Sequence, residues 1–201
     1  SKNFRSIEII NSSDIQESGV SNIIDLMPQI TGLDIRRRGA GGVQADLYIR
    51  GGGFDQTLLL IDGMKMDDSQ TGHHTLNMLL PVHLIERVEI IKGPAARIYG
   101  QNAFNGAINI ITKSLPKSKK KQFEMLVSNP TFGSFKQFGF LINSRLLLKQ
   151  KFNAQLTFSR SKSDGYRYNT DYINDFFFFK SEIKTQKNPI IITSGFTEKK
   201  F

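Results

Sequence analysis

The stretch LIERVEIIKGPAARIYGQNAFNGAINIITK, residues 84–113, decides the fold of the first half of the chain. Within it, Arg87–Lys92 alternates Val88 and Ile90 with charged or outward positions, which predicts a strand with at least one buried face. Gly93–Gly100 has a proline near its start and a glycine just past its end, the asymmetry expected of a helix of one or two turns. Ala107–Thr112 then predicts a second strand, so these two strands are joined through a helix and not by a simple hairpin turn.

The residues before this stretch predict more short strands and helices. Ser21 can cap a helix over Asn22–Met27 that Pro28 ends, and a further short helix is expected over either Leu76–Leu80 or Val82–Leu84. Asp62-Gly63 is a strong turn signal. Strands are expected at Ile7–Ile10, Leu33–Arg37, Asp46–Arg50, Thr57–Asp62 and Met64–Met66. Residues 1–113 are therefore predicted to be an α+β domain with a small mixed β-sheet and short helices.

The composition changes near residue 114. A basic linker is expected at 114–121, and residues 122–201 then predict antiparallel strands joined by turns at Ser163–Gly165 and Lys187–Pro189. Asn153–Ser159 alternates apolar and polar side chains, and the strands approach the ~10 residues that a tilted transmembrane strand needs. A soluble sandwich would show the same alternation. The run Phe176–Phe179 fits neither pattern.

Composition limits the other classes of function. Lys and Arg outnumber Asp and Glu by 27 to 18, and there are no cysteines and no apolar run long enough for a membrane-spanning helix. The chain has no phosphate-binding loop motif and no Gly-x-Ser-x-Gly motif, so neither nucleotide binding nor hydrolysis is predicted. His73 and His74 are adjacent and would point to opposite sides of an extended segment, so no metal site is predicted. The chain is not expected to be an enzyme or to hold a cofactor.

Residues 84–113 resemble the hallmark block of TonB-dependent outer-membrane receptor plug domains: a strand with Glu-Arg at its start, a Lys-Gly-Pro turn, a short helix ending in Tyr-Gly, and a closing Asn-Ile-Ile-Thr strand. Three further blocks are similar in order and spacing, namely VSNIIDLMPQITGLDIRRRG at 20–39, LYIRGG at 47–52 and LLLIDGMKM at 58–66. The resemblance implies a plug domain at 1–113, followed by the first strands of an incomplete outer-membrane β-barrel at 122–201.

This resemblance implies that the protein binds a scarce nutrient, such as a siderophore, haem, cobalamin or glycan, and gates its energy-coupled import across the outer membrane. The implied partners are TonB, the remainder of the barrel, the small nutrient ligand and the outer membrane. Two departures stand out. No TonB-contacting segment is recognised in Ser1–Ile10, and a plugged barrel needs ~22 strands, whereas residues 122–201 hold four or five. We expect the chain to be a fragment of a longer receptor, or else to share a barrel with another chain.

The resemblance also indicates site residues. Loops that face outward in the family are expected to contact the nutrient, and charged residues on the sheet are expected to form salt bridges between plug and barrel. The outward-loop candidates are Arg38, Gly41, Gly42, Asp67, Asp68, Gln70, His73 and His74. The salt-bridge candidates are Arg50, Glu86, Arg87 and Glu89.

Two alternatives come from other classes of function. A soluble basic module could bind a polyanion, but the lysine run at 117–121 has no aromatic residue interleaved with it, so nucleic acid is not a predicted partner. A docking or signalling adaptor could use the same plug fold without transport.

Overall fold

The structure is a computed structural model of the whole chain, and it describes residues 7–20, 22–39, 44–66, 76, 80–115, 122–129, 131–132, 135–148 and 152–201. It divides into two compact units, residues 1–113 and 114–201. Most of the predicted linker, 116–121, lies outside the described residues. No helix among the described residues is long and apolar enough to cross a membrane.

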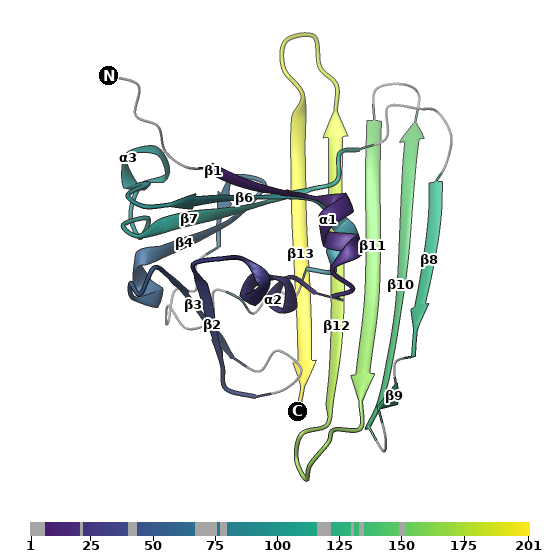
Figure 1. Cartoon of the computed structure of the whole chain (residues 1–201). Helices are drawn as coiled ribbons and strands as arrows, with labels where there is room; N and C mark the ends of the chain where they lie inside the picture. The colour runs from purple at the N-terminus through teal and green to yellow at the C-terminus, as the bar shows by residue number, and fades with distance from the viewer. Residues whose placement is uncertain are drawn as a thin grey trace. The chain divides into compact units, whose positions relative to one another are not determined.

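A mixed five-stranded sheet forms the centre of the first unit (Figure 1). Its strands are β1 (Ile7–Asn11), β4 (Thr57–Ile61), β5 (Met64–Lys65), β6 (Ile85–Lys92) and β7 (Gly106–Thr112), in the order β1-β6-β7-β4-β5. β4 and β7 are parallel and the other neighbours are antiparallel. The chain therefore has the predicted α+β architecture with a small mixed sheet.

Short helices and a hairpin complete this unit. The helices are α1 (Ser12–Glu17), α2 (Ile23–Leu26) and α3 (Ala96–Tyr99), and 3-10 turns cover Met27–Gln29, Phe54–Gln56 and Val82–Leu84. The hairpin pairs β2 (Leu33–Arg37) with β3 (Ala45–Ile49). The cap of α2 is Asn22 and not the predicted Ser21, because the Asn22 side chain accepts a hydrogen bond from the Asp25 amide at 3.0 Å.

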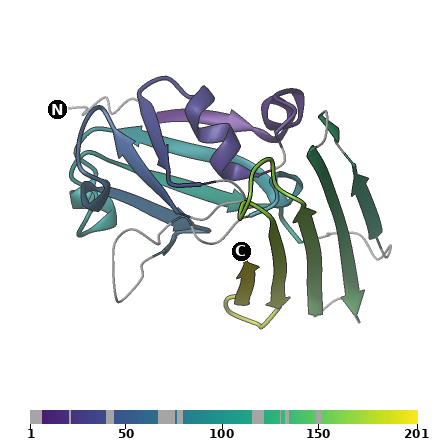
Figure 2. The same ribbon diagram turned by 90° about the horizontal axis from the view of Figure 1, so that it is seen from below.

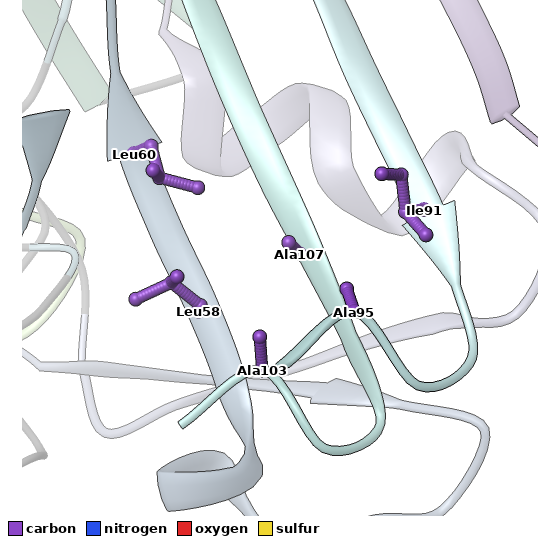
Figure 3. Packing of buried hydrophobic residues seen from close by; sticks show 6 residues of the cluster. All are labelled: Leu58, Leu60, Ile91, Ala95, Ala103 and Ala107. Atoms are coloured by element: carbon purple, nitrogen blue, oxygen red, sulfur yellow. The ribbon is translucent and has the colours of Figure 1, made fainter. Parts of the chain in front are cut away.

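Apolar side chains fill both sides of the five-stranded sheet. On one side, Val88 and Ile90 of β6 and Ile108 and Ile110 of β7 are at most 1% exposed. The other side carries a cluster of small residues near α3, consisting of Leu58, Leu60, Ile91, Ala95, Ala103 and Ala107. Figure 3 shows the three alanines between the leucines of β4 and Ile91 of β6. Small side chains suit this place because the Ala95 amide donates to the Ala103 carbonyl at 2.8 Å, which holds the two loop segments close together.

The second unit is a sheet of antiparallel strands lying side by side in one layer (Figures 1 and 2). Five strands follow the path β13-β12-β11-β10-β8, and the short β9 (Thr131–Phe132) pairs with β10. Their bounds are β8 Gln122–Ser128, β10 Phe135–Leu148, β11 Phe152–Ser163, β12 Tyr172–Ile183 and β13 Ile190–Lys200. Among the described residues this sheet is open, as predicted for an incomplete barrel.

The run Phe176–Phe179 is explained by its place on β12. Phe176 and Phe178 point to one face, where they are 3% and 1% exposed and stack with ring centres 6.3 Å apart. Phe177 points to the opposite face and is 41% exposed. The strand is therefore apolar on both faces at this level, and a pattern of strict alternation could not describe it.

Candidate functional site

The predicted nutrient-contacting loops are described mainly at their stems. Arg38 is exposed, and its amide donates to the Gln44 carbonyl at 2.9 Å, which closes the base of the β2–β3 loop. The second loop leaves the sheet at Met66, whose amide donates to the Leu59 carbonyl at 2.9 Å, and it is anchored by the buried side chains of Leu76 and Leu80. The other candidates lie outside the described residues: Gly41, Gly42, Asp67, Asp68, Gln70, His73 and His74.

The three consecutive arginines before the first loop have different surroundings. Arg37 forms an ion pair with Asp25 at 2.6 Å and also donates to the Ile24 carbonyl at 2.6 Å, so it ties the hairpin to α2. Arg36 lies over the Tyr48 ring, 4.5 Å from its centre, and also contacts Asp34 at 3.2 Å. Arg38 follows them on an exposed bend at the loop. Nothing in the sequence indicated the partners of the first two.

Three of the four salt-bridge candidates form one cluster on β6. Arg87 lies 2.8 Å from Glu89 and 3.6 Å from Glu86, measured between guanidinium nitrogens and carboxylate oxygens. Glu89 also accepts from the Asn109 side chain at 3.2 Å. These side chains are partly exposed, between 24% and 40%. Arg87 thus already has carboxylate partners within the first unit, the cluster keeps one negative charge in excess, and its exposed parts are still accessible to other groups.

Asn109 connects this cluster to the turn between β4 and β5. Its side-chain oxygen accepts from the Gly63 amide at 3.0 Å. The neighbouring Asp62 accepts from the Thr112 amide at 2.8 Å and from the Thr112 hydroxyl at 2.6 Å. Asp62 and Gly63 both have positive φ, 50° and 79°, as in a type I′ turn. The sequence predicted the turn, but nothing in it indicated that Asp62 fastens the turn to β7.

Arg50, the fourth salt-bridge candidate, lies away from this cluster. It follows β3 with φ at 49°, its amide donates to the Gly32 carbonyl at 3.1 Å, and its side chain is exposed. The adjacent glycine loop packs closely against Asn105, because a Cβ atom on Gly52 would come within 1.4 Å of the Asn105 side-chain nitrogen. Asn105 in turn donates to Gln56 at 2.6 Å. This loop is therefore fixed in place beside Arg50.

The second unit carries two faces of different character. On one face the central strands bear buried polar side chains, including Asn153, Gln155 and Thr157 of β11. The opposite face exposes apolar side chains across the sheet. They are Phe123, Met125, Val127, Leu156, Phe177, Ile183, Ile190, Ile192 and Phe196, each at least 36% exposed. A face of exposed Phe, Ile, Val, Leu and Met is suited to contact with lipid.

No group of three or more potential metal ligands occurs among the residues that the structure describes. His73 and His74 are not among those residues, so their predicted lack of a shared metal stays a prediction.

Comparisons with known proteins agree with this architecture. The family model described as the TonB-dependent receptor plug domain matches residues 2–107. A vitamin B12 transporter, BtuB, of Vibrio vulnificus strain YJ016 is 30% identical over 164 residues, which are 82% of this chain and 26% of that protein. BtuB of Vibrio cholerae strain M66-2 is 35% identical over 108 residues, or 54% of this chain and 18% of that protein.

Solved structures show the same fold at lower identity. The siderophore receptor PirA of Acinetobacter baumannii aligns with a TM-score of 0.77 at 20% identity, covering 96% of this chain and 31% of that one. A ferric enterobactin receptor, PfeA, of Pseudomonas aeruginosa aligns with a TM-score of 0.76 at 21% identity, covering 96% of this chain and 32% of that one. The chain thus spans about a fifth to a third of these longer relatives, and their names describe transporters or receptors. This chain belongs to the TonB-dependent receptor family and carries the family's plug domain at residues 2–107.

Proposed function

We propose that this chain is the nutrient-gating part of an outer-membrane importer, with a corrinoid of the vitamin B12 class as its first candidate ligand. The observation that supports a corrinoid as the ligand is the 30% identity to a vitamin B12 transporter over 82% of the chain. The siderophore receptors are at or below 22% identity and support only the fold. Siderophore, haem and glycan are the competing ligand classes.

The first unit supplies the gate in this proposal. The hydrogen bonds from Arg38 to Gln44 and from Met66 to Leu59 close the stems of the two outward loops, and the bonds that fasten Asp62 to Thr112 hold the turn that precedes the second loop. The loops between those stems would contact the nutrient through Arg38, Gly41, Gly42, Asp67, Asp68, Gln70, His73 and His74. TonB would supply the pulling force, and the outer membrane would be the location.

A chimeric receptor tests this function. The plug of the Vibrio vulnificus B12 transporter is replaced by residues 1–113, placed behind that transporter's own TonB-contacting segment, and uptake of labelled cyanocobalamin is measured in cells that lack another cobalamin receptor. We expect TonB-dependent uptake, whereas a barrel without any plug should show no dependence on TonB. A chimera that inserts in the outer membrane but takes up no cobalamin, while a siderophore-receptor chimera takes up its ferric siderophore, would exclude the corrinoid class.

The same chimera tests the loop residues. Arg38→Ala and the double change His73→Ala, His74→Ala should lower the affinity for cyanocobalamin. Arg36→Ala is the matched control, because Arg36 already packs on Tyr48 and pairs with Asp34. Equal affinity in all these variants would remove the loop residues from the proposed site.

The salt-bridge candidates Arg50, Glu86, Arg87 and Glu89 are proposed to hold the plug against the barrel wall. The side chains of Glu86, Arg87 and Glu89 are partly exposed and Arg50 is exposed, so all four are accessible to groups outside the first unit's own pairs. In the chimera, Arg50→Ala should increase leakage of a large antibiotic that the closed receptor excludes, and Arg36→Ala should not. Unchanged leakage in both would contradict a locking role for Arg50.

A further inference from the structure

The net positive charge of the chain resides in the second unit. Residues 1–113 contain 11 Lys and Arg against 12 Asp and Glu, whereas residues 114–201 contain 16 against six. The overall excess of nine positive charges is therefore not a property of the plug. A surface with such an excess attracts anionic partners.

The strand directions give this sheet two distinct ends. β10 and β11 are joined by residues 149–151, and β12 and β13 by residues 184–189; we name the end that carries these connections the turn end. The longer connection 164–171 joins β11 to β12 at the opposite end, the loop end. In outer-membrane barrels the short turns face the periplasm and the long loops face outward.

Three cations at the loop end have carboxylates beside them, whereas Arg167 lies over the Tyr166 ring. Arg160 forms two hydrogen bonds of 2.6 Å with Asp175. Lys200 lies 3.2 Å from Glu198, and Lys162 lies 4.0 Å from Asp164. These positive charges are largely balanced by neighbours on the same part of the sheet.

At the turn end, two exposed lysines have no carboxylate partner among the described residues. Lys184 and Lys187 are exposed, and neither forms an ion pair within the described part of the chain. The nearest carboxylate in sequence, Glu182, accepts from the Asn153 side chain at 3.0 Å. By sequence, Lys149 and Lys151 belong to the other connection at this end.

These lysines directly follow the apolar face. The last cross-strand row of that face is Phe152, Ile183 and Ile190, which are in register across β11, β12 and β13. Ile183 and Ile190 are 36% and 52% exposed, and Lys184 is the next residue along the chain. A lysine immediately beyond an apolar membrane face can place its alkyl chain along that face and its ammonium group among lipid headgroups.

We infer that the turn end of this sheet binds the phosphate groups of anionic phospholipids in the periplasmic leaflet, through Lys184 and Lys187. This inference rests on the proposed membrane location of the second unit. The apolar face supplies contact with the acyl chains, and the unopposed ammonium groups supply the preference for anionic over neutral headgroups. The loop end has a weaker preference because Arg160, Lys162 and Lys200 already have carboxylate partners.

Vesicle binding by the full chain tests the inference. Detergent-refolded chain is mixed with vesicles of phosphatidylcholine alone or of phosphatidylcholine with phosphatidylglycerol, and the bound fraction is measured by sedimentation. The unchanged chain should prefer the anionic vesicles, and added salt should weaken that preference. A lysine near an anionic surface is worth about 1 kcal/mol, or about fivefold in affinity, so Lys184→Gln with Lys187→Gln should reduce binding to the anionic vesicles about 30-fold.

The matched control is Lys162→Gln with Lys200→Gln, which removes the same charge at the loop end and should reduce binding less than about threefold, as expected for cations with carboxylate neighbours. Circular dichroism verifies the fold of both variants, whose changes are at exposed positions. Equal losses in the two variants, or equal binding to the two kinds of vesicle, would overturn the inference and leave the proposed function standing. Failure to bind either kind of vesicle would overturn the membrane location on which both rest.

Discussion

The two sheets of this protein use apolar residues in opposite ways. In the five-stranded sheet of the first unit, Ile90, Ile108 and Ile110 are at most 1% exposed and form a core. In the sheet of the second unit, Ile190, Ile192 and Phe196 are about half exposed, and polar Asn153 and Gln155 are buried on the other face. The first sheet is stabilised by excluding water from its own side chains. The second presents an apolar surface that needs another medium to cover it.

Truncating one isoleucine in each sheet should give the largest difference between them. Ile108→Ala removes a fully buried side chain and should lower the free energy of unfolding by about 2–5 kcal/mol. Ile192→Ala removes a side chain that is 47% exposed and should change it by less than about 0.5 kcal/mol. Urea unfolding of the detergent-refolded chain, followed by circular dichroism, measures both. Similar losses would mean that the outward face of the second sheet is packed as a core.

The turn of Asp62 offers a smaller test, confined to the first unit. Asp62→Ala removes the acceptor of two hydrogen bonds from Thr112 and puts alanine at a positive φ, so it should cost about 2–3 kcal/mol. Asp62→Asn keeps an acceptor for the Thr112 amide and a residue that tolerates positive φ, so its cost should be less than half as large. The same urea measurement compares the two variants. Equal costs would show that neither the retained acceptor nor the tolerance of positive φ matters, and that the stabilisation depends on the charged carboxylate itself.

Much of the first unit follows from local sequence signals. The alternation in Arg87–Lys92, the Asp62-Gly63 turn and Gly100 at the end of α3 predicted elements that the structure contains at nearly the same bounds. α1 was missed because Ser12–Glu17 is short and polar and buries a single side chain, Ile15. A helix held by one buried residue and a capping interaction of Asn11 with Asp14 leaves no periodic pattern to detect.

The candidate site was harder to predict than the fold. Arg36 and Arg37 are adjacent, yet one packs on Tyr48 and the other binds Asp25 and the Ile24 carbonyl. These partners are 12 or more residues away, and only the tertiary fold brings them together.

Strand β8 was also not predicted as a separate strand, because FEMLV at 123–127 lacks clear alternation.

Charge distinguishes the two units as well, with a smaller expected effect. Arg37→Ala removes a partly buried ion pair and a hydrogen bond to a carbonyl, so it should lower the stability of the first unit by about 1 kcal/mol. Lys184→Ala removes an exposed cation that has no ion pair in the described part of the chain, and it should leave unfolding unchanged. Urea midpoints at low and high salt measure both. A loss for Lys184→Ala equal to that for Arg37→Ala would show that turn-end lysines stabilise the fold.

Two tryptophan substitutions test directly whether the apolar face of the second sheet contacts lipid, and they should change stability least. The chain contains no tryptophan, so Phe177→Trp and Phe104→Trp each introduce a single tryptophan whose emission can be excited apart from that of the tyrosines. Both positions are exposed, at 41% and 61%, but Phe177 lies on the apolar face of the second sheet and Phe104 lies in the plug. Each substitution replaces one exposed aromatic ring with another, so stability should change by less than about 0.5 kcal/mol. In vesicles made with brominated acyl chains, the tryptophan at 177 should be strongly quenched because the apolar face contacts lipid, whereas the tryptophan at 104 should keep its emission. Equal quenching at the two positions would mean that exposed apolar residues meet lipid regardless of the sheet that carries them, and the contrast between the two units would no longer hold.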